Sequence, residues 1–121
     1  MNFASFIYEM LTRNKKISSR VLKNLAWVLK GITDYTLFSS QDLKFVVKSA
    51  TIIFNAHGSQ IQIDCLNIFK IYSDTLNEEI HAIIAVATEK LIGCLTSHTE
   101  NRVITGLCLR TICNLSSSNN S

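Results

Sequence analysis

Proline is absent from this 121-residue sequence, and glycine occurs only four times. Because proline is the strongest helix breaker and glycine weakens helix interiors, long segments are free to be helical. Long hydrophobic runs are missing as well, since the longest are broken at Lys48 and His81, short of the roughly 18 apolar residues that span a membrane. These absences predict a single helical domain that does not enter a membrane.

Strong charge of either sign is also lacking. Twelve Lys and Arg against nine Asp and Glu leave a net charge of +3, which is too mild for the field of a dedicated nucleic-acid binder. The densest basic run, from Arg13 to Lys23, has no interleaved aromatic residues, so we interpret it as a solvated connector. The first ten residues include Glu9 and no basic leader, which predicts no secretory signal. We therefore expect an intracellular protein that binds neither nucleic acid nor membrane.

Motifs for catalysis and for metal binding are missing. There is no HExxH, CxxC or paired-acid motif and no glycine-rich phosphate loop. The histidines stand apart, and the cysteines fall within apolar helical patterns at Cys65, Cys94, Cys108 and Cys113. We expect free, buried thiols in a reducing compartment. The sequence predicts no enzyme, no cofactor and no metal site.

Apolar residues recur at helical spacing along most of the sequence, most clearly over 41–55. Further amphipathic helices are predicted over 3–11, 78–86, 89–95 and 103–115. Side-chain oxygens followed three residues later by an acid predict helix starts at Ser39, Thr75 and Ser97. No strand-like alternation competes with this all-α pattern.

Three segments align without gaps: 21–33, 61–73 and 104–116. Each repeats one apolar stripe at spacings of four, four and three, which places the stripe on one helix face. The stripes are Val21/Leu25/Leu29/Ile32, Ile61/Cys65/Phe69/Tyr72 and Ile104/Cys108/Ile112/Leu115. A period of about 40 to 47 residues built from two or three helices is typical of HEAT and armadillo solenoids. An ordinary helical bundle is the alternative.

The segment Lys23–Gly31, with Asn24 three residues before Trp27, resembles the third-helix signature of the armadillo-repeat importin-α (karyopherin-α) family. Further matches follow in that family's order, over 63–67, 73–80 and 109–115. The resemblance covers nearly the whole chain from Lys23 onward. It implies an all-α, armadillo-type right-handed superhelical solenoid of about two and a half to three repeats. We expect a repeat domain over 1–116, divided into 1–38, 39–74 and 75–116, followed by a disordered polar tail over 117–121.

In that family, the third helices line a concave groove that binds an extended, lysine-rich nuclear localisation signal. The resemblance implies that Trp27 stacks a lysine stem, that Asn24 and Asn114 bond the peptide backbone, that Asp64 attracts a lysine, and that Arg110 meets an acidic or carbonyl group. The physics is reasonable, because an indole face attracts a cation by about 0.5–2 kcal/mol. An asparagine amide can also both donate to and accept from a bare peptide backbone.

Some family residues are replaced. Gly31 stands where a backbone-binding asparagine is expected, Asn67 and Ile71 replace an aromatic station, and the proline usual at the start of the second helices is missing. The basic N-terminal segment that engages importin-β is also missing, so we do not expect importin-β binding. The sequence therefore predicts an import-adaptor-like protein of cytoplasm and nucleus. The alternatives are an armadillo scaffold with another partner, or a fragment without independent activity. Open solenoid ends predict self-association.

Overall fold

The computed structural model describes residues 3–13, 16–35, 40–55, 58–74, 77–97 and 101–119, which form seven α-helices and no strand. The helices are α1 (Phe3–Arg13), α2 (Ser19–Tyr35), α3 (Ser40–Ile53), α4 (Ser59–Ser73), α5 (Glu78–Ala85), α6 (Thr88–Ser97) and α7 (Arg102–Asn119). The predicted all-α class is confirmed.

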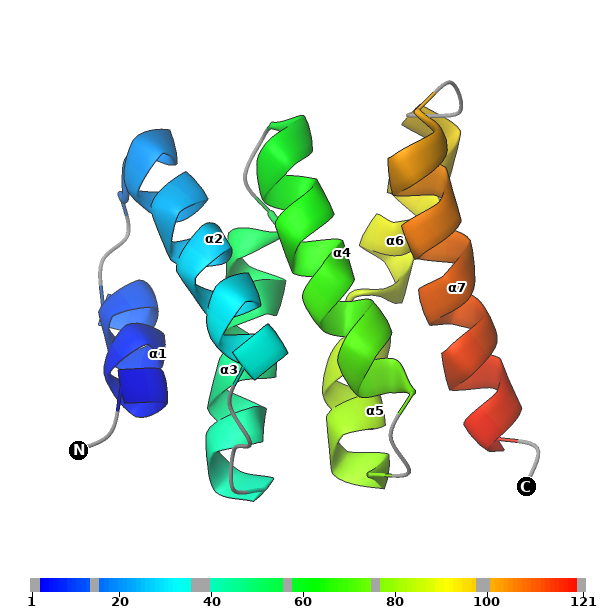
Figure 1. Cartoon of the computed structure of the whole chain (residues 1–121), viewed down its shortest axis with the longest axis horizontal. Coiled ribbons are helices and arrows are strands. Elements are labelled where there is room, and N and C mark those ends of the chain that lie inside the picture. Colours follow the sequence, from blue (N-terminus) through cyan, green and yellow to red (C-terminus); the bar gives the residue numbers. More distant parts are fainter. Residues whose placement is uncertain are drawn as a thin grey trace.

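The helices lie in two layers (Figure 1). In one layer α2 packs against α4, and α4 packs against α7. In the other, α1 packs against α3 and α3 against α5, while α6 packs against α7. Helix α3 joins the layers through contacts with α2 and α4. The three segments that align in the sequence are therefore the three neighbouring helices of one layer.

The apolar stripe is buried most completely in the central helix of that layer. All four stripe residues of α4 are buried, and Phe69 meets Phe54 edge to face at 5.4 Å between ring centroids. In α2 and α7 only Leu29, Ile104 and Cys108 of the stripe are buried, and Val21 is 43% exposed. The reason is position, because α4 has a helix on both sides whereas α2 and α7 stand at the two ends of the layer.

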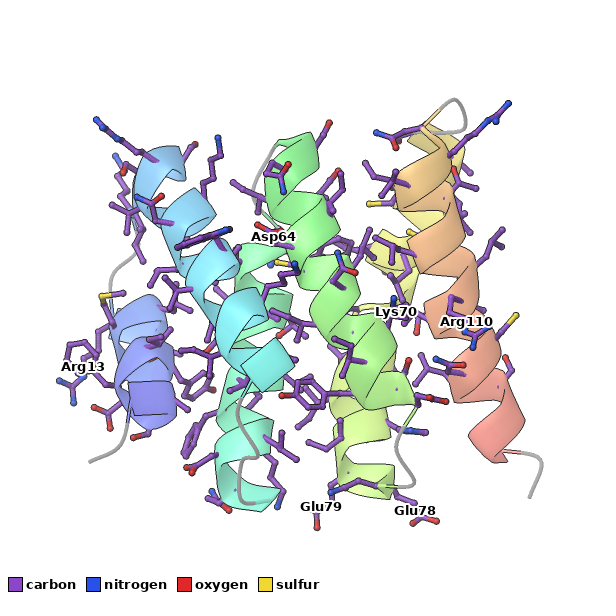
Figure 2. The ribbon with its side chains drawn as sticks, viewed as in Figure 1. Arg13, Asp64, Lys70, Glu78, Glu79 and Arg110 are labelled. Atoms are coloured by element: carbon purple, nitrogen blue, oxygen red, sulfur yellow. The ribbon has the colours of Figure 1, made fainter. Side chains whose placement is uncertain are left out.

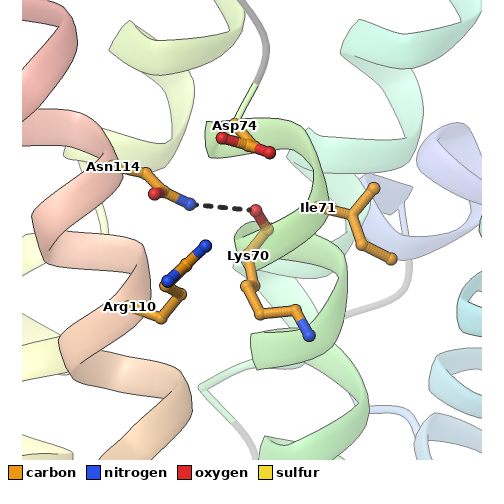
Figure 3. A pocket seen from close by; sticks show the side chains of 5 residues that line it. All are labelled: Lys70, Ile71, Asp74, Arg110 and Asn114. Atoms are coloured by element: carbon orange, nitrogen blue, oxygen red, sulfur yellow. Dashed lines mark hydrogen bonds between the residues drawn. The ribbon is translucent and has the colours of Figure 1, made fainter.

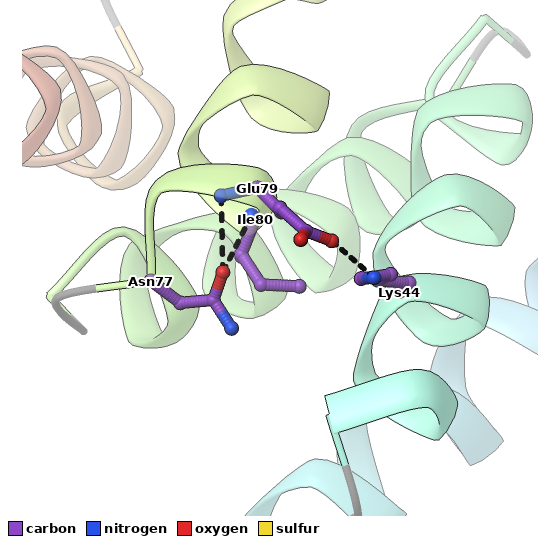
Figure 4. Close-up of polar contacts among 4 residues, drawn as sticks. All are labelled: Lys44, Asn77, Glu79 and Ile80. Atoms are coloured by element: carbon purple, nitrogen blue, oxygen red, sulfur yellow. Dashed lines mark hydrogen bonds and ion pairs between the residues drawn. The ribbon is translucent and has the colours of Figure 1, made fainter.

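Two helix starts differ from the predicted ones. The Asn77 side chain caps α5, its Oδ1 accepting hydrogen bonds from the backbone N–H groups of Glu79 (3.0 Å) and Ile80 (3.2 Å) (Figure 4). Asn101 caps α7 in the same way, with 3.1 and 3.2 Å bonds. The predicted starts at Thr75 and Ser97 are therefore wrong in position. Asparagine is as favourable an N-cap residue as serine or threonine, so residue type alone does not decide which of them caps a helix. Ser39 and Thr75 lie outside the described residues.

Helices α5 and α6 are separated by Val86 and Ala87 and are bent by 51° relative to each other. The predicted division between 78–86 and 89–95 is therefore confirmed, although no proline makes the turn. Glu79 of α5 also pairs with Lys44 of α3 (Figure 4), which links two helices of one layer. Within the described segments no single helix is long and apolar enough to cross a membrane, and α5 with α6 is the one bent pair that meets that criterion.

Two further expectations need correction at the C-terminal end. Helix α7 continues to Asn119, so the predicted disordered tail over 117–121 is helical for its first three residues, and Asn120 and Ser121 lie outside the described residues. No proline interrupts this segment, and adding a residue to an existing helix is far easier than nucleating one. Cys113 is exposed, whereas the other three cysteines are buried and free as expected.

Candidate peptide-binding surface

Helix α2 presents Asn24 and Trp27 on its exposed face. Trp27 is 67% exposed, and Asn24 is also exposed, with a side chain that forms no hydrogen bond with a described residue. Residues three apart share a helix face, and the buried contacts of α2 come from Ala26 and Leu29 instead. The prediction that Trp27 lies off the buried stripe is confirmed. Beside it, a Cβ added at Gly31 would meet no atom within 4 Å, so there is open space one turn after the indole.

Asp64 of α4 occupies a different environment from the predicted one. Its side chain is 3% exposed, Gln60 Nε2 donates to its Oδ1 at 3.2 Å, and Oδ2 accepts no hydrogen bond from the described part of the chain. Burial raises the pKa of this carboxyl, while Gln60 and then Lys30 and Lys23 of α2 act in the opposite direction. Asp64 is therefore buried, and its predicted attraction for a peptide lysine stays a prediction.

The cause is again the position of the helix in the layer. Asp64 aligns with Asn24 across the repeats, and Asn24 is open because α2 ends the layer. At the same register α4 is covered by neighbouring helices. A carboxylate here can influence a ligand lysine through its field, but its oxygens do not reach the surface.

Arg110 and Asn114 of α7 are brought together with residues of α4. With Lys70, Ile71 and Asp74 they line a groove of about 470 Å³ between the two helices (Figure 3). The predicted pairing of Arg110 with Asn114 on one face is confirmed. Lys70 and Asp74 were missed by sequence reasoning, because the repeat alignment pairs Arg110 and Asn114 with Asn67 and Ile71 of α4 and pairs no predicted site residue with Lys70 or Asp74.

Asn114 is already engaged within the protein. Its Nδ2 donates to Ser73 Oγ at 3.0 Å and to the Lys70 carbonyl oxygen at 3.4 Å (Figure 3 shows the latter). The amide nitrogen is thus bonded to α4, and Oδ1 has no described partner. Asn114 therefore ties α7 to the last turn of α4, and its predicted bond to a peptide backbone stays a prediction.

The charges at this groove are mostly positive. Lys70 and Arg110 lie on facing sides of α4 and α7 (Figure 2), and neither forms an ion pair with a described residue. The exposed Asp74 is the one acidic lining residue. The groove therefore suits an anionic or hydrogen-bond-accepting group better than a lysine.

The predicted site residues thus lie along one layer: Asn24 and Trp27 on α2, Asp64 on α4, and Arg110 with Asn114 on α7, with α4 in the middle. Among the described residues, no three His, Cys, Asp or Glu side chains are grouped to hold a metal ion. Comparison of the chain with protein-family models, curated proteins and solved structures finds no match.

Proposed function

We propose that this chain is an armadillo-type right-handed superhelical solenoid of about two and a half to three repeats, similar to importin-α. It binds the extended, lysine-containing peptide of a nuclear localisation signal along α2, α4 and α7. The support for the fold is the two-layer arrangement, in which the three repeat-equivalent helices are neighbours. The support for the function is a surface on that layer with an uncovered aromatic side chain, Trp27, and the open amide group of Asn24.

One observation carries the proposal, namely the exposure of Trp27. A tryptophan that is 67% exposed leaves a large apolar face in water, and such side chains are frequent anchors in binding sites. The flanking Lys23 and Lys30 are on the same helix, so the indole is the apolar element of an otherwise polar face. It offers a lysine stem both apolar contact and cation–π attraction of about 0.5–2 kcal/mol.

The neighbouring groups define what this station does. Asn24 has a free amide that can donate to and accept from a peptide backbone. Gly31 leaves room for that backbone to approach α2. Asp64 acts through its charge from below the surface, and Asn114 has an Oδ1 without a described partner. A single aromatic station, with Gly31 in place of its backbone-binding asparagine, predicts weak binding, and transport between cytoplasm and nucleus would depend on it.

The test uses Trp27, which is the one tryptophan of the chain, so its intrinsic fluorescence reports on the site directly. A lysine-rich labelled peptide should bind in fluorescence anisotropy, and Trp27→Ala should weaken binding about tenfold, as for a typical interface anchor. Val21→Ala is the matched control, because Val21 is another exposed apolar residue of α2. Equal affinity for wild type and Trp27→Ala, or no binding at millimolar peptide, would exclude the import function.

A second candidate function is an armadillo scaffold for a partner that is not basic. The observation that favours it is the pair of unpaired cations, Lys70 and Arg110, on the same layer as Trp27. A lysine-rich peptide gains nothing from them, whereas a partner with carboxylates does. Binding of an acidic peptide that is independent of Trp27 would favour the scaffold.

A further inference from the structure

The two halves of the proposed peptide-binding layer each carry two cations, Lys23 and Lys30 on α2 and Lys70 and Arg110 at the α4–α7 groove, but only the α2 half adds an aromatic face. At α2, Trp27 offers an aromatic face to a cation. At the α4–α7 groove, Lys70 and Arg110 face a space of about 470 Å³ without an ion-pair partner among the described residues. A peptide that carries lysines along its whole length would place one of them next to these two cations, where like charges repel.

The chemistry of the groove points to a carboxylate. An arginine guanidinium presents a planar fork of donors that matches the two oxygens of a carboxylate, and a lysine adds a second positive charge. Asp74 cancels part of this charge, which leaves the groove positive by one unit from its lining residues. Ile71 adds an apolar wall, against which the methylene groups of a glutamate can lie.

A phosphate group shares this anionic chemistry, so nucleic acid is the competing source of the ligand. Among the described residues no aromatic side chain lines the groove, although single-stranded nucleic acid is normally held by base stacking as well as by charge. The mild net charge of +3 also falls short of the basic surface that such proteins carry. The observations therefore favour a peptide carboxylate.

The distance between the two stations follows from the fold. Helix α4 lies between α2 and α7, so the α4–α7 groove is one and a half to two helix spacings from α2, or roughly 12–20 Å for packed helices. An extended chain covers about 3.3 Å per residue, so this span corresponds to about four to six residues.

We infer that the partner is a mixed-charge peptide, with a lysine bound at Trp27 and a glutamate or aspartate about four to six residues away bound between Lys70 and Arg110. This inference rests on the proposed function, since it assigns the second contact of the same extended peptide. It makes the protein selective for a charge pattern instead of for total positive charge.

The experiment compares three labelled peptides of identical length in fluorescence anisotropy. All carry the same lysine cluster; the first has a glutamate six residues away, the second a glutamine there, and the third a glutamate only two residues away. The first peptide should bind about fivefold to tenfold more tightly than the other two, as expected for one charge-assisted contact at a partly open site. Arg110→Gln should abolish this advantage, and Arg110→Lys should restore part of it.

The matched control is Arg102→Gln, since Arg102 is also an exposed arginine of α7 but does not line the groove. It should keep the full advantage of the first peptide. Trp27→Ala should weaken all three peptides by a similar factor and preserve their order. Far-ultraviolet circular dichroism of each variant checks that the helices are intact.

The outcomes separate the two proposals. Equal affinity of the first and second peptides, together with a loss in Trp27→Ala, overturns the acidic contact and leaves the proposed function standing. An Arg110-dependent glutamate preference, together with equal affinity of wild type and Trp27→Ala for all three peptides, overturns the lysine station. Stronger displacement by a single-stranded oligonucleotide than by the first peptide, lost in Arg110→Gln, overturns the assignment to a carboxylate.

Discussion

Replacing Asn114 by alanine tests whether this amide belongs to the fold or to a ligand. In the structure its Nδ2 donates to Ser73 Oγ at 3.0 Å and to the Lys70 carbonyl at 3.4 Å. Ser73 Oγ still donates to the Lys70 carbonyl, so the substitution leaves no buried group wholly unpaired. The loss is therefore that of one good hydrogen bond and one weak one, or about 1–1.5 kcal/mol.

Helix propensity acts in the opposite direction, because alanine is a better helix former than asparagine by up to about 0.7 kcal/mol. Asn24→Ala corrects for this, since Asn24 also lies inside a helix but its side chain forms no hydrogen bond with a described residue. We expect Asn24→Ala to be neutral or slightly stabilising and Asn114→Ala to be destabilising. The difference between the two variants isolates the link between α7 and α4.

The measurement is thermal unfolding followed by circular dichroism at 222 nm, with urea unfolding as a second determination. For 121 residues an unfolding entropy of about 2.1 cal/mol/K per residue makes 1 kcal/mol correspond to about 4 °C. The two variants should therefore differ in Tm by about 4–6 °C. Equal Tm values would refute the link and return Asn114 to the role of a free peptide-binding amide.

Two more outcomes follow from buried groups. Because burial raises the pKa of Asp64 against the opposing effects of Gln60, Lys30 and Lys23, the folded state holds its proton more tightly than the unfolded chain. The charged form of Asp64 therefore destabilises the folded state, and this destabilisation grows as the pH rises from the carboxyl pKa of the unfolded chain to its raised pKa in the folded protein. Asp64→Asn should raise Tm near neutral pH by an amount that shrinks at about pH 4, and a gain independent of pH would contradict the buried carboxylate. A thiol reagent such as Ellman's should label one cysteine rapidly, because the other three are buried. If rapid labelling of one thiol persisted in Cys113→Ser, the exposed cysteine would be one of the other three.

Helix positions were largely predictable because they depend on local pattern. The stripe over 61–73 predicted the body of α4, and the break before 89–95 predicted that α5 and α6 are separate helices. The caps at Asn77 and Asn101 were not selected in advance. Several residues near each helix start have a side chain that can cap, and the choice depends on where the helix packs.

The candidate site, like the helices, was predictable from the sequence only in part. Periodicity alone placed Trp27 off the buried stripe, because a helix turns by a constant angle per residue whatever surrounds it. Alignment alone also placed Arg110 and Asn114 on one face. Burial of Asp64 could not follow from either, since its aligned counterpart Asn24 is exposed. Two residues at equivalent repeat positions differ because only one of them has a helix on each side.

By itself, then, the sequence determined the helical class, the helix faces and the repeat, all of which arise from contacts between residues three or four apart along the chain. Tertiary structure decided which repeat-equivalent positions stay open and which amide hydrogens remain free. It also brought Lys70 of α4 beside Arg110 of α7. The physical reason is that solvent exposure and charge pairing depend on neighbours distant in the sequence, and the number of neighbours changes from the middle of a helical layer to its ends.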